Sequence, residues 1–245
     1  SRAGAPFRKA QGKEMMSATM SFGCSGVDVQ RFLSYVRDNP ARLKDWAGKT
    51  SGKEDDLFTP YIEEPFRAAA KTGEIPKGMR VEVLWHSLTE AGEATHINAV
   101  RIMGIDPTNI MDLTRAEIEG RRHALLILKV MQKAVPGFEK AKLRTFAPCV
   151  GVRSSRKIIG EYNITEDDVR NQARFEDSIG IVPEFLDGYG LVIIPTTGRY
   201  FQVPYGVTLP QQIENLLVAG RCIGGDRLSH AATRQMVCCA VTGQG

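Results

Sequence analysis

Several signatures that would assign the sequence to an enzyme class are absent. It contains no Gly-x-Gly-x-x-Gly, which would mark a dinucleotide-binding turn, and no Gly-x-Ser-x-Gly, which would mark a serine hydrolase. None of its five cysteines is spaced as Cys-x-x-Cys, and its four histidines are scattered without a His-x-x-x-His pair. The sequence therefore predicts neither a serine hydrolase nor a bound metal.

Long runs of one kind are missing as well. No apolar stretch reaches transmembrane length, no signal peptide precedes the first residues, and no block of lysine and arginine accompanies the formal charge of +4. We therefore expect neither a membrane span nor a nucleic-acid partner. The odd number of cysteines favours buried free thiols in a reducing compartment, which predicts a cytoplasmic protein.

What the sequence does offer is an ordinary composition with periodic segments. Its 245 residues, 42% of them hydrophobic, suffice for one large domain or two small ones. The periodicities predict an α/β or α+β fold with a mixed sheet. The expected helices are residues 27–36, 60–71, 114–135 with a Thr114–Glu117 capping box, and a short one capped by Thr165 and Asp168. The expected strands are residues 15–24, 80–84, 95–103, 146–152, and a hairpin of 191–195 and 200–203, with 46–57 as a surface loop.

The last thirty residues carry the strongest local pattern. The apolar residues 216–219 predict a short strand buried on both faces, as in parallel sheets. Gly220, Gly224 and Gly225 then permit a tight turn, and an apolar helix is expected from Ser229 through Val241. A strand, a glycine turn and a helix N-terminus together predict a site for an anionic or electron-rich ligand.

Five ordered segments resemble one known family, the FAD-dependent oxidoreductases with a glutathione-reductase-type flavin domain, related to the fumarate reductase group. The most specific segment is Asn-Leu-Leu-Val-Ala-Gly-Arg-Cys-Ile-Gly-Gly-Asp through His-Ala-Ala-Thr-Arg at 215–234. The others are Arg-Ala-Gly-Ala-Pro-Phe at 2–7, Asp-Leu-Thr-Arg-Ala-Glu-Ile-Glu-Gly-Arg-Arg at 112–122, Val-Pro-Gly-Phe-Glu at 135–139 and Gly-Val-Arg-Ser-Ser-Arg-Lys-Ile-Ile-Gly-Glu-Tyr at 151–162. Residues 38–80 match least.

The resemblance implies a partial Rossmann-like FAD-binding domain with an inserted mixed-sheet substrate domain. On this pattern residues 1–14 end the first flavin-domain segment, residues 15–203 form the substrate domain with a helical insertion, and residues 204–245 form the last flavin-domain segment. Because the glycine fingerprint is absent and no initiator methionine begins the sequence, we expect a piece of a longer protein. The pyrophosphate and adenosine sites would then lie outside these residues.

The resemblance also implies a set of site residues. Those expected to line the flavin are Gly220, Arg221, Gly224, Gly225, Asp226, Ser229, Ala231 and Ala232. His230 and Arg234 stand one helical turn apart and are implied as the catalytic pair, with the histidine titrating near working pH. The expected substrate-binding residues are Arg153, Arg156 and Asn98.

Plainer interpretations of the same residues stay open. His230 and Arg234 fit a capped helix start whose arginine pairs with a neighbouring carboxylate. Arg153 and Arg156 fit a structural ion pair with Glu161 or Asp168, and Asn98 fits a hydrogen-bonded or solvated strand face.

The leading hypothesis is an FAD-dependent oxidoreductase that transfers a hydride between a small organic substrate and FAD. It implies a small-molecule substrate and an electron acceptor that the sequence does not identify, and it leaves a homo-oligomer open. The alternative is a non-catalytic, flavoprotein-like interaction module or subunit, which the missing dinucleotide fingerprint favours.

Overall fold

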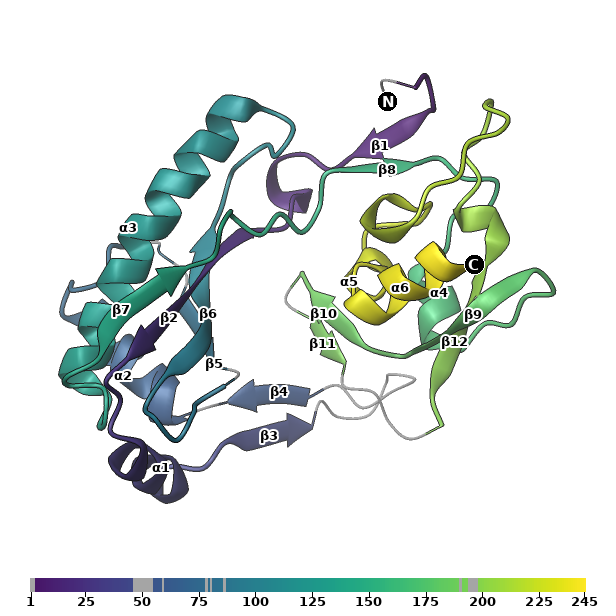
Figure 1. The fold of residues 1–245 in the computed structure, drawn as a ribbon. Helices are drawn as coiled ribbons and strands as arrows, with labels where there is room; N and C mark the ends of the chain where they lie inside the picture. Colours follow the sequence, from purple (N-terminus) through teal and green to yellow (C-terminus); the bar gives the residue numbers. More distant parts are fainter. Residues whose placement is uncertain are drawn as a thin grey trace. The chain divides into compact units, whose positions relative to one another are not determined.

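The chain folds into two compact units in a computed structural model (Figure 1). The structure describes residues 3–45, 55–58, 60–77, 79, 81–85, 87–189, 191–193 and 198–245. Unit 1 comprises Ser1–Met16, Lys44–Asp56 and Arg153–Gly245, and unit 2 comprises Ser17–Leu43 and Leu57–Val152. The chain therefore passes from one unit to the other after residues 16, 43, 56 and 152. The flavin and substrate roles expected for the segments stay predictions.

Unit 2 is built on a four-stranded sheet in the order β5-β6-β2-β7. Its strands are β5 (Val81–Trp85), β6 (Ala94–Ile102), β2 (Ala18–Ser25) and β7 (Lys142–Phe146). Their pairings are all antiparallel, so the expectation of a mixed sheet was wrong. Short connections such as the one between β5 and β6 make neighbours antiparallel, because a parallel pair needs a long crossover. The expected strand at 146–152 lies mostly beyond β7, where the Ala147 amide donates to the Ser21 carbonyl at 2.8 Å and the Thr19–Gly151 bridge continues the pairing.

The long helix α3 (Ile110–Ala134) covers one face of this sheet (Figure 1). It approaches β2 closely at Gly120, where an added Cβ would lie 2.9 Å from the Met20 Cβ. The predicted capping box was wrong, because Asn109 caps the helix earlier by accepting a hydrogen bond from the Met111 amide at 2.9 Å. The Glu117 carboxylate instead accepts from the Val150 amide at 2.5 Å. The predicted end of the helix before Pro136 is confirmed.

Two further helices complete the core of unit 2. They are α1 (Val29–Asp38) and α2 (Pro60–Lys71), both close to their predicted ranges. Phe32 is the buried residue of α1, and its ring meets those of Phe138 and Tyr61 edge-on, with centroids 5.0 and 6.3 Å away. Gly137 makes this packing feasible, because it has a φ of +94° and an added Cβ would lie 2.7 Å from the Phe32 Cβ.

Unit 1 contains three two-stranded antiparallel pairs and short helices. β1 (Phe7–Lys9) pairs with β8 (Arg156–Ile158), β9 (Ser178–Pro183) with β12 (Tyr200–Pro204), and β10 (Leu186–Gly188) with β11 (Leu191–Ile193). The hairpin expected between residues 191–195 and 200–203 was therefore wrong, because β11 takes β10 as its partner. Residues 194–197 lie outside the described chain. The remaining pieces are α4 (Glu166–Arg170), α5 (His230–Thr233), α6 (Met236–Gln244) and the 3-10 turns Gly12–Glu14, Tyr205–Val207 and Gly220–Cys222.

The capping box predicted for α4 is confirmed. The Thr165 hydroxyl accepts from the Asp168 amide at 3.2 Å, and the Asp168 carboxylate accepts from the Thr165 amide at 2.8 Å. Of the loop expected at 46–57, residues 46–54 lie outside the described chain. Residues 55–57 belong to β4 (Asp55–Phe58), which is placed beside β3 (Arg42–Asp45).

The C-terminal prediction fails in two places. Residues 216–219 form no strand, and 58% of Leu217 is exposed. An apolar run needs a parallel sheet to bury both faces, and none of the strand registers described is parallel. The expected continuous helix from Ser229 is broken into α5 and α6, because Gln235 adopts extended backbone with a ψ of 150°.

The cysteines follow the prediction only in part. All five are free, and Cys24 and Cys238 are buried, but Cys149 is exposed and Cys222 and Cys239 are half-buried. Burial raises the pKa of the Cys238 thiol to about 12, which keeps it protonated. No described helix combines the length and the hydropathy that crossing a membrane requires.

Candidate functional site

The glycine segment before α5 is held by one carboxylate in unit 1. Asp226 Oδ1 accepts a hydrogen bond from the Ser229 amide at 2.7 Å, and Oδ2 accepts one from the Glu166 amide at 2.8 Å. Asp226 therefore joins the start of α5 to the start of α4. Its carboxylate has a structural task in addition to the flavin contact that the resemblance implies.

Gly224 and Gly225 are required by the protein's own backbone. A Cβ on Gly224 would lie 2.6 Å from the Tyr162 carbonyl oxygen, and one on Gly225 would lie 3.0 Å from the Ser229 hydroxyl. Gly225 also forms an isolated parallel bridge with Ile164. Close approach of two backbone segments thus explains these glycines, and a ligand is not needed to account for them.

Gly220 differs from the other two glycines. It has a φ of +78°, and the nearest neighbour of an added Cβ would be the Cys239 sulfur at 3.9 Å. Its amide donates to the Thr242 hydroxyl at 2.9 Å, which ties the segment to α6. Arg221 follows with an exposed side chain. Of the predicted flavin contacts, this pair lies where the surface is open.

His230 lies at the start of α5 with only 2% of its surface exposed. Its Nε2 lies 3.0 Å from the Arg153 carbonyl oxygen, which can only accept, so Nε2 carries the proton. Burial, aided by the nearby Lys157 ammonium, lowers the pKa of His230 to about 4. The expectation that this imidazole titrates near working pH was therefore wrong. It is a neutral hydrogen-bonding group.

Acid should destabilise the protein through this histidine. Because its pKa is about 4 when folded and about 6.5 when unfolded, the unfolded chain binds the extra proton first as the pH falls through that window. The protein has its full stability at a pH above the unfolded pKa. As the pH falls to the folded pKa, the free energy of unfolding decreases by up to about 3 kcal/mol. Urea unfolding of the wild type and His230→Gln at pH values of about 7 and about 4 measures the difference. Equal pH dependence in both proteins would contradict the assignment.

Arg234 lies one turn after His230, as predicted, and it has a carboxylate partner. Its Nη2 lies 2.8 Å from Asp187 Oδ2 and also donates to the Asp187 carbonyl, which belongs to β10. The side chain is 11% exposed, yet its buried Nε has no hydrogen-bond partner within the described part of the chain. One edge of the guanidinium is thus held by the protein while an N–H on it remains available.

The sequence reasoning missed Lys157, which lies in β8 opposite Arg8. Its Nζ donates to the Asp226 carbonyl, and burial lowers its pKa to about 8, with Asp226 opposing that shift and Arg8 reinforcing it. The alternation of exposed and buried side chains along a strand could have indicated that Lys157 points inward. Neighbours in a strand point to opposite faces, so the exposed Arg156 leaves Lys157 directed inward.

The predicted flavin residues around His230 are deeply buried. Ser229, Ala231 and Ala232 have no exposed surface, and the two alanines belong to the hydrophobic core of unit 1. The Ser229 hydroxyl donates to the Ile164 carbonyl at 2.8 Å. Their side chains are therefore committed to the fold.

The predicted substrate residues Arg153 and Arg156 make different contacts. Arg153 presents its carbonyl to His230, whereas the Arg156 guanidinium stacks over the Phe7 ring at 5.4 Å. Neither alternative ion pair, with Glu161 or Asp168, is among the contacts that the structure describes for Arg156. Its cation–π contact gives it a structural task on the β1–β8 ribbon.

Asn98 belongs to unit 2, on β6. The register pairs Ser21 with Asn98 and Thr19 with Arg101, because a bulge absorbs Ala99 between them. Asn98 and Arg101 therefore share a sheet face although their spacing would place them on opposite faces. The Asn98 Oδ1 is buried and finds no hydrogen-bond partner among the described residues. Its substrate role stays a prediction.

A family model described as FAD dependent oxidoreductase matches residues 1–245. The chain belongs to this family. No curated protein and no solved structure matched in the corresponding comparisons. Membership of the FAD dependent oxidoreductase family indicates a flavin redox function, and it implies a substrate and an electron acceptor in general terms.

The site in unit 1 fits a flavin chemically. A flavin ring presents polar atoms and develops negative charge, so it needs donors and nearby cations. Lys157, Arg234 and the open Arg221 supply cations, and the unpaired Nε of Arg234 supplies a buried donor. The dipole of a continuous helix is not available, because α5 spans four residues. Charge at this site therefore comes from side chains.

Proposed function

We propose that this protein is an enzyme that transfers a hydride between a small organic substrate and FAD. The observation that carries the proposal is the buried cluster around α5, in which a neutral histidine, an arginine with an unpaired Nε and a lysine of lowered pKa converge in a chain of the FAD dependent oxidoreductase family. Bound FAD supplies the hydride chemistry, and the protein supplies orientation and charge.

Arg234 is suited to binding a carboxylate or carbonyl group of the substrate. Asp187 fixes one edge of its guanidinium, so the remaining donors are oriented before the substrate arrives. His230 supports this role indirectly, because its one N–H is used on the Arg153 carbonyl and holds the ring in place. Because its pKa lies far below neutrality, we assign it to positioning and not to proton transfer.

Lys157 is the candidate for holding a proton. A lysine whose pKa lies at about 8 exchanges a proton near neutral pH far more readily than an ordinary lysine. Its Nζ is anchored by the Asp226 carbonyl, on the glycine segment that the family resemblance assigns to the flavin. In this arrangement the ammonium also favours negative charge on a group bound beside it.

The first test is spectroscopic. The complete protein, purified and supplied with FAD, is expected to show the visible absorbance of a bound flavin, which should bleach under argon when small organic acids, alcohols or amines are added. Absence of bound flavin would refute the proposal and would favour the non-catalytic interaction module. A flavin that binds but is reduced by none of these compounds would refute hydride transfer from that substrate class.

Replacing Arg234 with lysine separates substrate binding from flavin binding. The variant keeps the charge but loses the planar fork, so we expect unchanged flavin absorbance and a KM raised by about tenfold or more. Arg37→Lys, at an exposed position in the last turn of α1, serves as the matched control. An unaltered KM would remove Arg234 from the substrate site.

A further inference from the structure

The outward face of α3 carries two rows of side chains, each repeating every seven residues. The apolar row consists of Met111, Ile118 and Leu125, which are 70%, 48% and 44% exposed. The cationic row consists of Arg115, Arg122 and Lys129, all exposed, each following an apolar residue by four positions. Four positions make one helical turn, so the rows run side by side for about 21 Å.

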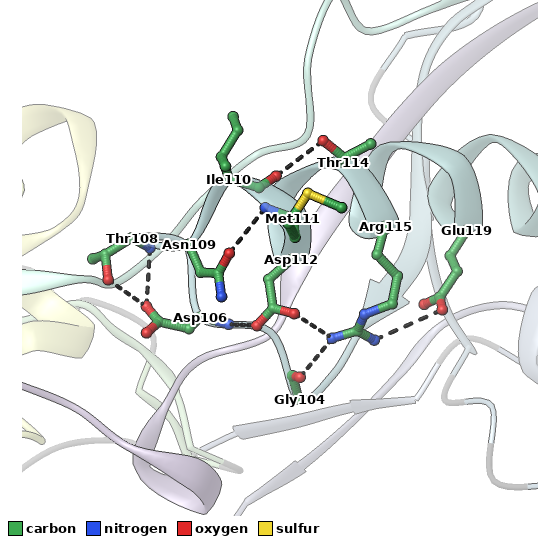
Figure 2. Close-up of polar contacts among 10 residues, drawn as sticks. All are labelled: Gly104, Asp106, Thr108, Asn109, Ile110, Met111, Asp112, Thr114, Arg115 and Glu119. Atoms are coloured by element: carbon green, nitrogen blue, oxygen red, sulfur yellow. Dashed lines mark hydrogen bonds and ion pairs between the residues drawn. The ribbon is translucent and has the colours of Figure 1, made fainter.

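The N-terminal end of this surface is held rigidly (Figure 2). Arg115 Nη2 donates to the Gly104 carbonyl at 2.9 Å and to Asp112 Oδ1 at 3.2 Å, and Asp112 Oδ2 accepts from the Asp106 amide at 2.8 Å. These bonds tie the loop before the helix to its first turns. The exposure of Met111 therefore does not result from a frayed helix end.

More apolar surface lies at the same end. Ile110, which precedes Met111 in the sequence, is 71% exposed, and Met103, in the segment before the helix, is 49% exposed. The Asp106 carboxylate accepts from both the amide and the hydroxyl of Thr108, at 2.9 and 2.7 Å, which orders the turn between them (Figure 2). An ordered group of exposed apolar side chains is the usual mark of a binding surface.

The charge of the cationic row is balanced at one end only. Arg115 lies 3.2 Å from Asp112 and 3.7 Å from Glu119, so neighbouring carboxylates offset its charge. Arg122 and Lys129 have no ion-pair partner in the ranges that the structure describes. The second half of the surface thus presents apolar side chains beside uncompensated positive charge, which is complementary to an acidic amphipathic partner.

We propose that α3 docks an acidic amphipathic helix of a partner protein. Apolar residues at seven-residue intervals supply one of the two apolar positions per heptad in a helix–helix seam, and charged residues flanking such a seam select the partner. A lipid surface would take a wider apolar face than this single row. A second copy of the chain in antiparallel orientation would bring the two cationic rows together, which disfavours self-pairing.

The test uses a synthetic helical peptide of about four heptads, with leucine at the seam and glutamate on both flanks. A control peptide carries lysine in place of glutamate. By fluorescence anisotropy the whole protein should bind the acidic peptide at least about tenfold more tightly than the basic one, and Arg122→Glu/Lys129→Glu should reverse this preference. Ile118→Lys/Leu125→Lys should abolish binding of both peptides while circular dichroism shows a folded protein.

Four other results would contradict the docking of an acidic helix on α3. Equal affinity for the two peptides, or binding of the acidic peptide that survives the charge reversal, would overturn the proposal. Sedimentation of the protein with phosphatidylserine vesicles, lost in Ile118→Lys/Leu125→Lys, would assign the face to a lipid surface instead. A homodimer that the same variant dissociates would assign it to a second copy.

Discussion

Replacing Arg199 with methionine is expected to destabilise unit 1 by about 3–5 kcal/mol, because the change leaves a buried carboxylate without its guanidinium. Arg199 Nε donates to the carboxylate of Glu184, which is 1% exposed, and its Nη2 donates to the Arg170 carbonyl at 3.1 Å. The two residues adjoin the paired ends of β9 and β12. Urea unfolding followed by circular dichroism measures the loss.

The double variant Arg199→Met/Glu184→Met distinguishes a lost ion pair from a general packing defect. If the loss of the ion pair to a buried carboxylate is the cause, removing Glu184 as well should recover much of the lost stability. The surface pair Arg144–Glu93, with N···O at 2.6 Å and side chains that are 51% and 32% exposed, supplies the control. Arg144→Met should cost less than about 1 kcal/mol. A similar loss for both single variants would contradict the argument from burial.

Truncating Phe32 to alanine is expected to destabilise unit 2 by about 3–5 kcal/mol. Phe32 is 1% exposed, and it joins α1 to the rings of Phe138 and Tyr61. Since it is the buried residue of α1, its loss removes the anchor of the whole helix. Hydrogen exchange should therefore show that the amides of α1 lose protection before those of the central sheet.

The neighbouring Leu33→Ala provides the control for Phe32. Leu33 lies on the same helix with 40% of its surface exposed, so its truncation should change stability by less than about 1 kcal/mol. Equal losses in the two variants would show that helix propensity and not the aromatic cluster determines the stability of α1.

Elements with local signals were predictable from the sequence. Apolar spacing and stop residues placed α1 and α2, and the Thr165 and Asp168 side chains placed α4, because caps depend on residues a few positions apart. The apolar run at 216–219 was mispredicted since burial depends on neighbouring strands that the local sequence does not specify. The break between α5 and α6 was also missed, because no glycine or proline marks it in the sequence.

Two residues of the candidate site, His230 and Arg234, were named from the sequence, whereas Lys157 and the electrostatics of the cluster were not. Sequence reasoning placed His230 and Arg234 one turn apart, and the structure brings both near Lys157 in one cluster. The neutral state of His230 depends on its burial and on that lysine, which lies far away in sequence. The shared face of Asn98 and Arg101 depends on a bulge, which shifts the strand period by one residue without a sequence mark.

The pairing of β1 with β8 has a consequence for the order of folding. Phe7 pairs with Ile158, and all of unit 2 is synthesised between these two partners. Closing so long a loop is entropically costly until the intervening chain has become compact. During translation, unit 2 can therefore fold first, and the N-terminal segment has to wait, without its strand partner, until residue 158 has left the ribosome.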